Sequence, residues 1–185
     1  MTVSAAASVL SLAGARPRLH PSVFVAAGAR VVGDVEMGEH SSVWYNAVIR
    51  GDRSAVVIGA RSNVQDGVAI HVDASSPARI GDDVSIGHNA VVHGCTVGDG
   101  CLIGMNSTVL GGAVVGAGSL VAGGAVVLEG TVIPPGSLVA GVPAKVRREL
   151  TETEREGLLQ NARTYLQLSD EHRTAQAAVP PVESP

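Results

Sequence analysis

A six-residue repeat runs through most of the chain and constrains its fold more than any other feature. An aliphatic residue recurs every six positions, and a small residue usually stands four places after it. Nineteen such units follow one another, with three changes of spacing. The aliphatic positions are Val25, Val31, Met37, Val43, Ile49, Ile58, Val64, Ile70, Ile80, Ile86, Val92, Val97, Ile103, Val109, Val115, Val121, Val127, Ile133 and Val139. This regularity indicates a stacked architecture, in which each unit covers the apolar face of its neighbour.

Each unit has the length of a short strand and ends at a corner that admits only a small side chain, which favours strands over helices. The corner residues are Ala29, Val35, Ser41, Ala47, Ser62, Ala90, Cys101, Ser107, Ala113, Ser119, Ala125, Thr131 and Ser137. The repeat resembles that of the hexapeptide-repeat family, and this resemblance implies three units per turn. Such a chain forms a triangular prism whose rungs lie about 4.8 Å apart, the separation of neighbouring strands. The wider spacing between Ile70 and Ile80 predicts a loop at about 73–77 that bulges from the prism.

The segments outside the repeat have different patterns. Residues 1–18 show no period and are expected to form a loose arm, followed by the prism at 19–146. Thr151 and Glu154 form a capping box, which predicts a helix over 150–173. The apolar face of this helix should pack on the prism, and it consists of Leu158, Leu159, Ala162, Tyr165, Leu166 and Ser169. The Pro-rich segment 177–185 is expected to be disordered.

Composition excludes several classes of partner. The net charge of −4 and the lack of any run of Lys or Arg argue against nucleic acid and against a membrane surface. No stretch reaches the roughly 18 apolar residues that span a bilayer. Cys95 and Cys101 are too few for a disulfide framework, so we expect two reduced, buried thiols. The N-terminal segment lacks the positively charged start of an export signal, and we expect a cytoplasmic protein.

Three of the six histidines fall within a short part of the repeat, between Ile70 and Gly94. His71 and His93 hold the second position of units that lie three apart, so they should sit on successive rungs of one face, close enough to share a metal ion. His88 holds the third position of a unit on the preceding face, above Asp66. That face points elsewhere, so we expect His88 to complete the site of an adjacent copy in a symmetric trimer. The remaining histidines are expected to be solvated and without function: His20, His40 and His172.

These residues resemble a known family. The arrangement of R-G-D at 50–52, N-V-Q-D at 63–66, the three histidines, and H-G-C at 93–95 followed by I-G-M-N is similar to the γ-class carbonic anhydrases of the hexapeptide-repeat superfamily. The resemblance covers residues 17–168. It implies an all-β, left-handed parallel β-helix with a C-terminal α-helix, assembled as a homotrimer. It also implies Zn2+, or Fe2+ or Co2+, at each subunit interface, held by His71, His88 and His93, and the reversible hydration of CO2 to bicarbonate.

Three neutral imidazoles leave a tetrahedral ion one open position for water, and the cation acidifies that water so that hydroxide can attack CO2. By the resemblance, Gln65 hydrogen-bonds the metal-bound water or bicarbonate, Arg50 and Asp52 pair across the subunit interface, and Asp66 supports the site. Asp73 is the candidate for carrying the proton away.

The aromatic residues leave two interpretations open. Tyr165, on the predicted helix, either reaches the metal pocket or packs in the core. Trp44 and Tyr45 are expected to pack against the helix.

Other functions remain compatible with the same prism. Coenzyme A-dependent acyltransferases and thioesterases share it, although such transferases usually use one histidine as general base. A catalytically weak scaffold that keeps a metal for trimer stability is a further alternative. The archaeal form of the family has a longer acidic loop and a Glu after its R-x-D, whereas this chain has H-V-D-A-S-S-P and Arg53 there, which leaves its catalytic rate open.

Overall fold

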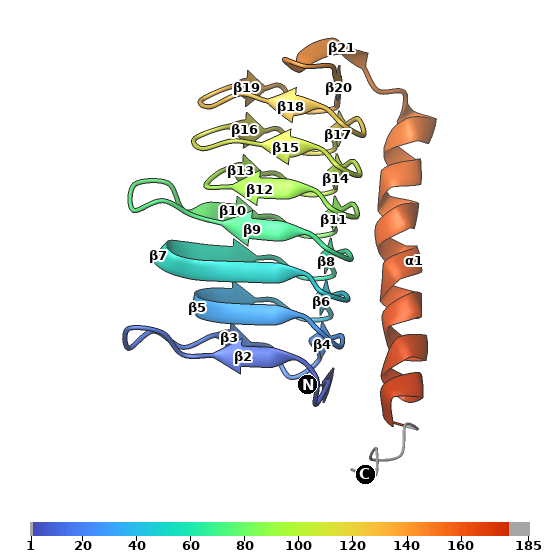
Figure 1. Ribbon diagram of the computed structural model, residues 1–185. Helices are drawn as coiled ribbons and strands as arrows, with labels where there is room; N and C mark the ends of the chain where they lie inside the picture. The colour runs from blue at the N-terminus through green and yellow to red at the C-terminus, as the bar shows by residue number, and fades with distance from the viewer. Residues whose placement is uncertain (1, 178–185) are drawn as a thin grey trace.

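Short parallel strands stack into a three-sided coil, and one long helix lies along its side (Figure 1). The structure, a computed structural model, describes residues 2–177. One face is a nine-stranded sheet made of β1 (Thr2–Val3), β4 (Phe24–Val25), β6 (Ser42–Val43), β8 (Asn63–Val64), β11 (Ser85–Ile86), β14 (Leu102–Ile103), β17 (Leu120–Val121), β20 (Ser137–Ala140) and β21 (Lys145–Glu149). The chain is therefore a parallel β-helix, as the repeat predicts.

The other two faces share one twelve-stranded sheet, because β5 and β7 pair with the strands of both faces. Its strands are β2 (Ser8–Leu10), β3 (Arg18–Leu19), β5 (Arg30–Met37), β7 (Val48–Ile58), β9 (Ala69–His71), β10 (Ala78–Ile80), β12 (Val91–His93), β13 (Thr96–Val97), β15 (Thr108–Val109), β16 (Val114–Val115), β18 (Val126–Val127) and β19 (Val132–Ile133). The changes of spacing in the repeat coincide with the bend of β7 and with a loop between β9 and β10, where Asp73 and Ser76 form a bridge.

The core lies inside the coil and follows the six-residue frame. All nineteen aliphatic residues of the repeat are buried, and none is more than 3% exposed. The small corner residues are buried too, except Thr131. Stacked Val and Ile side chains on neighbouring rungs thus remove each other from water, which is the main stabilising contribution in such a fold.

The prism begins earlier than the sequence predicted, so the expectation of a loose arm over 1–18 is wrong for the described residues. β1 pairs with β4, and both β2 and β3 pair with β5. Val3, Val9 and Leu19 pack against the core cluster, since each falls on the aliphatic column one rung below the residues that follow. Small side chains bury little surface, but backbone hydrogen bonds to the next rung hold this N-terminal segment in place.

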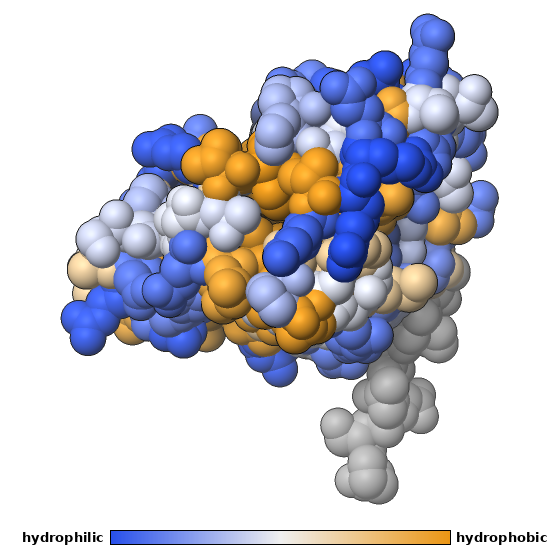
Figure 2. All heavy atoms as spheres, turned by 90° about the horizontal axis from the view of Figure 1, so that it is seen from above, coloured by the Kyte–Doolittle hydropathy of each residue, from blue (hydrophilic) through white to orange (hydrophobic). Residues whose placement is uncertain are grey.

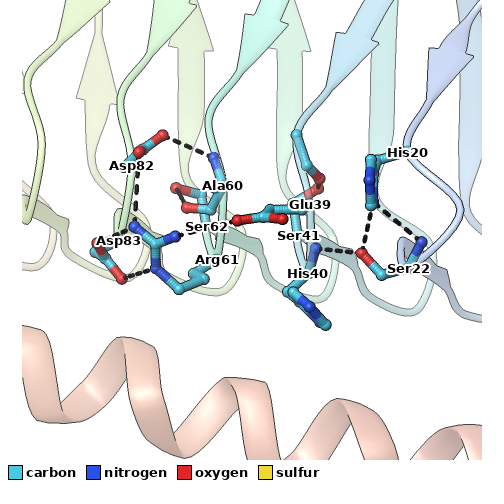
Figure 3. A network of polar contacts seen from close by, with 11 residues as sticks. His20, Ser22, Glu39, His40, Ser41, Ala60, Arg61, Ser62, Asp82 and Asp83 are labelled. Atoms are coloured by element: carbon cyan, nitrogen blue, oxygen red, sulfur yellow. Dashed lines mark hydrogen bonds and ion pairs between the residues drawn. The ribbon is translucent and has the colours of Figure 1, made fainter.

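A column of charged side chains ties successive rungs together at one corner of the prism (Figure 3). Arg61 donates two hydrogen bonds of 2.8 Å to Asp83, and it also faces Glu39 and Asp82. The hydrogen bond with Asp83 raises the pKa of Arg61. At the same corner, the backbone N–H of His40 donates to Ser22 Oγ, which also contacts the ring of His20.

The helix α1 (Glu152–Ala177) packs on the nine-stranded sheet and begins with the predicted capping box. The Glu154 N–H donates to Thr151 Oγ1, and the Thr151 N–H donates to the Glu154 carboxylate. On the inner face of the helix, the side chains of Leu158, Ala162 and Ser169 are buried. The helix ends at Ala177, four residues beyond the C-terminal end of the predicted range 150–173. The segment expected to be disordered lies outside the described residues from 178 onward.

Aromatic side chains fasten the lower half of α1 to the sheet. The ring of Trp44 lies 5.5 Å from that of Phe24 and 5.2 Å from that of Tyr165, both edge to face. Tyr45 Oη lies 2.8 Å from His172 Nδ1, and the His172 ring also packs on Trp44. The prediction that Trp44 and Tyr45 pack against the helix is confirmed, whereas His172 is half-buried rather than solvated.

The two ends of the coil differ. At one end β21 pairs antiparallel with β20, which ends the parallel repeat before the predicted boundary at 146. Apolar side chains gather among polar ones on this end of the molecule (Figure 2), where Leu128, Val132, Val142 and Val146 are exposed. At the other end, the Arg173 guanidinium donates hydrogen bonds to Thr2 Oγ1 and the Ser22 carbonyl.

Within residues 2–177, no helix combines the length and apolar character needed to cross a membrane.

Candidate metal centre

His71 and His93 come together on one face of the prism. β9 and β12 are parallel neighbours, and their register pairs His93 directly with His71. The Nδ1 of His71 lies 3.1 Å from the Nε2 of His93, and the ring centroids are 5.1 Å apart. The pairing predicted from the six-residue frame is confirmed, because residues in register on adjacent parallel strands project from the same side of the sheet.

The separation of these two nitrogens suits a shared metal ion. A tetrahedral ion that binds nitrogen at about 2.0–2.1 Å places two of its ligands roughly 3.3 Å apart. The observed 3.1 Å is close to that value. The two imidazoles therefore fit two of the ligand positions of one cation with little rearrangement.

A carboxylate and a guanidinium stand behind His71. Asp52 Oδ1 lies 2.9 Å from His71 Nε2, and Arg50 donates to the other carboxylate oxygen of Asp52. Desolvation raises the pKa of Asp52, but the hydrogen bonds from His71 and Arg50 outweigh it and the net pKa is lowered. The resemblance implied that Arg50 and Asp52 pair across a subunit interface, whereas within the single chain they pair with each other. Asp52 is thus placed to orient the His71 ring.

Asp73 stands on the exposed side of His93. Its Oδ2 lies 3.7 Å from His93 Nδ1, and its side chain is 63% exposed. The loop that carries it packs on Gly94, where φ is +51° and an added Cβ would lie 2.7 Å from the Ser76 carbonyl oxygen. Gly94 therefore lets the loop lie close to the histidine pair.

His88 lies on the nine-stranded sheet with different neighbours. Its Nδ1 is 2.8 Å from Asp66 Oδ2, and its Nε2 is 3.2 Å from the Tyr165 hydroxyl. Burial, with a smaller effect of the Asp66 charge, raises the pKa of Tyr165, so the phenol keeps its proton. The packing interpretation of Tyr165 is confirmed, since its ring packs on Trp44, and its hydroxyl also reaches His88.

The three histidines do not meet within one chain. Across residues 2–177, no three His, Cys, Asp or Glu side chains are arranged as a metal site. His88 follows β11 of the nine-stranded sheet, whereas His71 and His93 belong to the other sheet. A site that uses all three histidines therefore needs a second copy of the chain.

Gln65 is held by a buried chain of hydrogen bonds that the sequence analysis missed. Asn63 donates from Nδ2 to Ser85 Oγ at 2.9 Å, and its Oδ1 accepts from Gln65 Nε2 at 2.9 Å. Nε2 carries two N–H donors and one of them goes to Asn63, so the Gln65 side chain can still donate from Nε2 and accept at its carbonyl oxygen. Asn63 and Ser85 occupy the same position in successive units of this face, which is the signal that could have found them.

The cysteines belong to the core rather than to the site. Both are unpaired and buried, as predicted. Burial raises the pKa of Cys95 to about 12 and that of Cys101 to about 11. Neutral thiols of this kind are poor nucleophiles and poor metal ligands.

Comparison with known proteins assigns the family. The family model described as "Bacterial transferase hexapeptide (six repeats)" matches residues 77–111 and 94–129. "Gamma carbonic anhydrase 3, mitochondrial" of Arabidopsis thaliana is 49% identical over 87% of this chain, which spans 65% of that longer protein. A Methanocaldococcus jannaschii protein named "Probable carbonic anhydrase" is 56% identical over 149 residues, 80% of this chain and 94% of that protein. The chain belongs to the γ-carbonic anhydrase family.

A solved structure shows the same fold. The product of the Bacillus cereus BC4754 gene, named only provisionally as an acetyltransferase, superimposes with a TM-score of 0.91. It is 37% identical and the match covers 92% of this chain and 99% of that one. The γ-carbonic anhydrase family and the hexapeptide transferases thus share this β-helix, and the site rather than the fold must decide the activity.

Proposed function

We propose that this member of the γ-carbonic anhydrase family catalyses the reversible hydration of CO2 to bicarbonate, at metal sites between the subunits of a homotrimer. The observation that carries the proposal is the pair of facing nitrogens on His71 and His93, with a third histidine on a different face. Two ligands from one chain and one from the next are what this arrangement can supply. Three-fold symmetry repeats the site three times and leaves no histidine of the set unused.

In the proposed site, His71 and His93 of one chain and His88 of a second copy hold Zn2+, Fe2+ or Co2+, all of which accept imidazole ligands. Such a cation, when bound, supplies a Lewis acid that acidifies water. Asp52 and Asp66 each contact the ring of one ligand histidine, which fixes the orientation of that ring. We infer that both carboxylates raise metal affinity.

The remaining residues act on the substrate and the proton. Gln65 offers the second N–H of its Nε2 as a donor and its carbonyl oxygen as an acceptor, while Asn63 and Ser85 keep the amide from rotating. Tyr165 keeps its proton and can donate a hydrogen bond to a bicarbonate oxygen beside His88. Asp73 Oδ2, at the solvent-exposed edge, is the proposed acceptor that passes a proton to solvent.

Three measurements on the purified full chain test the proposal. Native mass spectrometry and elemental analysis should find a three-chain particle with about one ion per chain, and stopped-flow assays should find CO2 hydration that chelation abolishes. His93→Ala should lose both metal and turnover. His40→Asn is the matched control, because His40 is exposed with a positive φ that Asn tolerates. A monomer with a full complement of metal, or turnover that survives His93→Ala, would contradict it.

Acyl transfer is the second candidate, favoured by the structural likeness to the Bacillus cereus protein. A coenzyme A ester should be assayed beside CO2 with the same metal-loaded samples. Turnover of the ester that does not need His71 and His93, together with no CO2 hydration, would favour acyl transfer. Metal binding without either activity would favour the scaffold.

A further inference from the structure

A cavity of about 430 Å3 lies between α1 and the nine-stranded sheet, directly beside the proposed site. One end is polar and is lined by Gln65, His88 and Tyr165. The rest is lined by Leu102, Leu120, Ala122, Met105 and the neighbouring glycines, and by Asn161 of α1, whose Oδ1 is buried without a hydrogen-bond partner. The register of the strands fixes this order, because Leu102 lies one rung above Ser85 and Leu120 one rung above Leu102.

The cavity exists because one column of the sheet changes from large to small side chains. Trp44, Gln65, Gly87, Gly104 and Ala122 each follow the last residue of a strand on successive rungs of this face. Trp44 fills the space beneath the helix and contacts Tyr165. The glycines and Ala122 cannot reach α1, so the space beneath it stays open on the upper rungs.

The cavity is larger than the proposed reaction needs. At about 30 Å3 per heavy atom, the volume of one water in the liquid, bicarbonate takes roughly 120 Å3. More than half of the cavity then remains, and its walls are aliphatic except for the Asn161 amide. Such a division, with polar groups at one end and aliphatic walls at the other, is suited to an amphipathic ligand.

We propose that this cavity binds aliphatic carboxylates of up to about twelve carbons, because about 430 Å3 holds roughly 14 heavy atoms at about 30 Å3 each. The carboxylate lies where bicarbonate binds, beside Gln65 and His88, because both anions present the same CO2− group. The alkyl chain lies among Leu102, Leu120 and Ala122. The inference rests on the proposed function for the position of the carboxylate, and it makes these acids competitive inhibitors of bicarbonate dehydration.

The test is a chain-length series on the metal-loaded full chain. Acetate, butyrate, hexanoate, octanoate, decanoate, dodecanoate and tetradecanoate, each below its critical micelle concentration, are titrated calorimetrically and also assayed as inhibitors. Affinity should rise about fourfold for each methylene that enters the apolar end, the ratio expected for burying one such group. The rise should stop when the cavity is full. Equal affinity across the series would overturn the inference.

Two substitutions should change, in opposite directions, the chain length at which the affinity stops increasing. Ala122→Leu takes up the volume of about three heavy atoms and should end the gain about three carbons earlier, while acetate binds as before. Leu102→Ala enlarges it and should let the gain continue to longer acids. Leu138→Ala is the matched control, because Leu138 lies one rung above Leu120 in the same column and outside the cavity lining. Thermal unfolding of each variant shows whether it is folded.

The outcomes separate this inference from the proposed function. CO2 hydration in the parent without any dependence on chain length overturns the inference alone. No hydration and no binding of any carboxylate overturns both. A chain-length dependence that Ala122→Leu leaves intact places the alkyl chain elsewhere and also overturns the inference.

Discussion

His71 and His93 stand in register on β9 and β12, and their facing ring nitrogens lie 3.1 Å apart. Nothing in the local sequence around either residue requires this contact, since 21 residues separate them. The coil brings them together because one full turn, including the loop between β9 and β10, returns the chain to the same face. The geometry of the pair is therefore a property of the repeat.

Asp52→Asn should weaken metal binding about 10- to 100-fold, the usual effect of losing a carboxylate behind a ligand histidine. The neutral amide no longer favours the orientation of the His71 ring that Asp52 holds at 2.9 Å. Competition with a chromophoric chelator measures the dissociation constant. Asp170→Asn is the control, because Asp170 is 74% exposed on α1 and faces Arg173 rather than a histidine of the set. Unchanged affinity in Asp52→Asn would argue against the orienting role.

Asn63→Ala should lower turnover about tenfold, the equivalent of one lost hydrogen bond of about 1.4 kcal/mol. Gln65 Nε2 and Ser85 Oγ both lose their partner, so Gln65 is free to rotate. The free energy of unfolding should fall by about 1–3 kcal/mol, while metal content stays unchanged. Stopped-flow kinetics and urea unfolding give the two values. Thr96→Ala, an exposed strand position on another face, should change neither.

Trp44→Ala should destabilise the protein by about 3–5 kcal/mol, as large-to-small changes of buried aromatic residues do. Trp44 is 3% exposed and contacts Phe24, Tyr165 and His172. Urea unfolding followed by circular dichroism measures the loss. Tyr45→Phe, which removes only the hydroxyl that reaches His172, should cost much less. Equal losses in the two variants would show that the aromatic packing matters less than the hydrogen bond.

Glu154→Gln should lower the melting temperature at neutral pH but not in strong acid. The hydrogen bonds from Arg148, and then from Thr151, lower the pKa of Glu154 from 4.5 to about 2. A carboxylate with a lowered pKa stabilises the folded state fully above its unfolded value, and the effect is lost as the pH falls toward the folded value. The difference between parent and variant should therefore be constant above about pH 5 and vanish near pH 2. A difference that persists at pH 2 would contradict this assignment.

The sequence predicted the coil well because the residues that recur every six positions are the ones that become buried. Each aliphatic residue in the frame is buried, and the face that carries His71 and His93 follows from counting units. The first rung was missed because its aliphatic residues, Val3, Val9 and Leu19, are interrupted by a loop that hides the period. Once the loop is allowed for, Val3 and Val9 are six residues apart and continue the column.

The site was predicted less completely than the coil. The histidines proposed as ligands can be recognised by residue type, whereas Asn63 and Ser85 are ordinary polar residues whose role depends on a contact between rungs. The cavity could not be predicted, because it depends on where α1 lies above the sheet. Periodicity places side chains on faces, but it does not give the distance between a face and what covers it.

The helix α1 is anchored at both ends of the coil. The residues before it pair with the last parallel strand, and Arg173 near its end bonds Thr2 on the first. A helix of 26 residues is about 39 Å long, which equals roughly eight strand spacings. The length of the helix therefore matches the height of the coil. Adding or deleting one complete turn of the coil would require about three residues more or fewer in α1. The number of turns in the coil can therefore change only when the length of α1 changes with it.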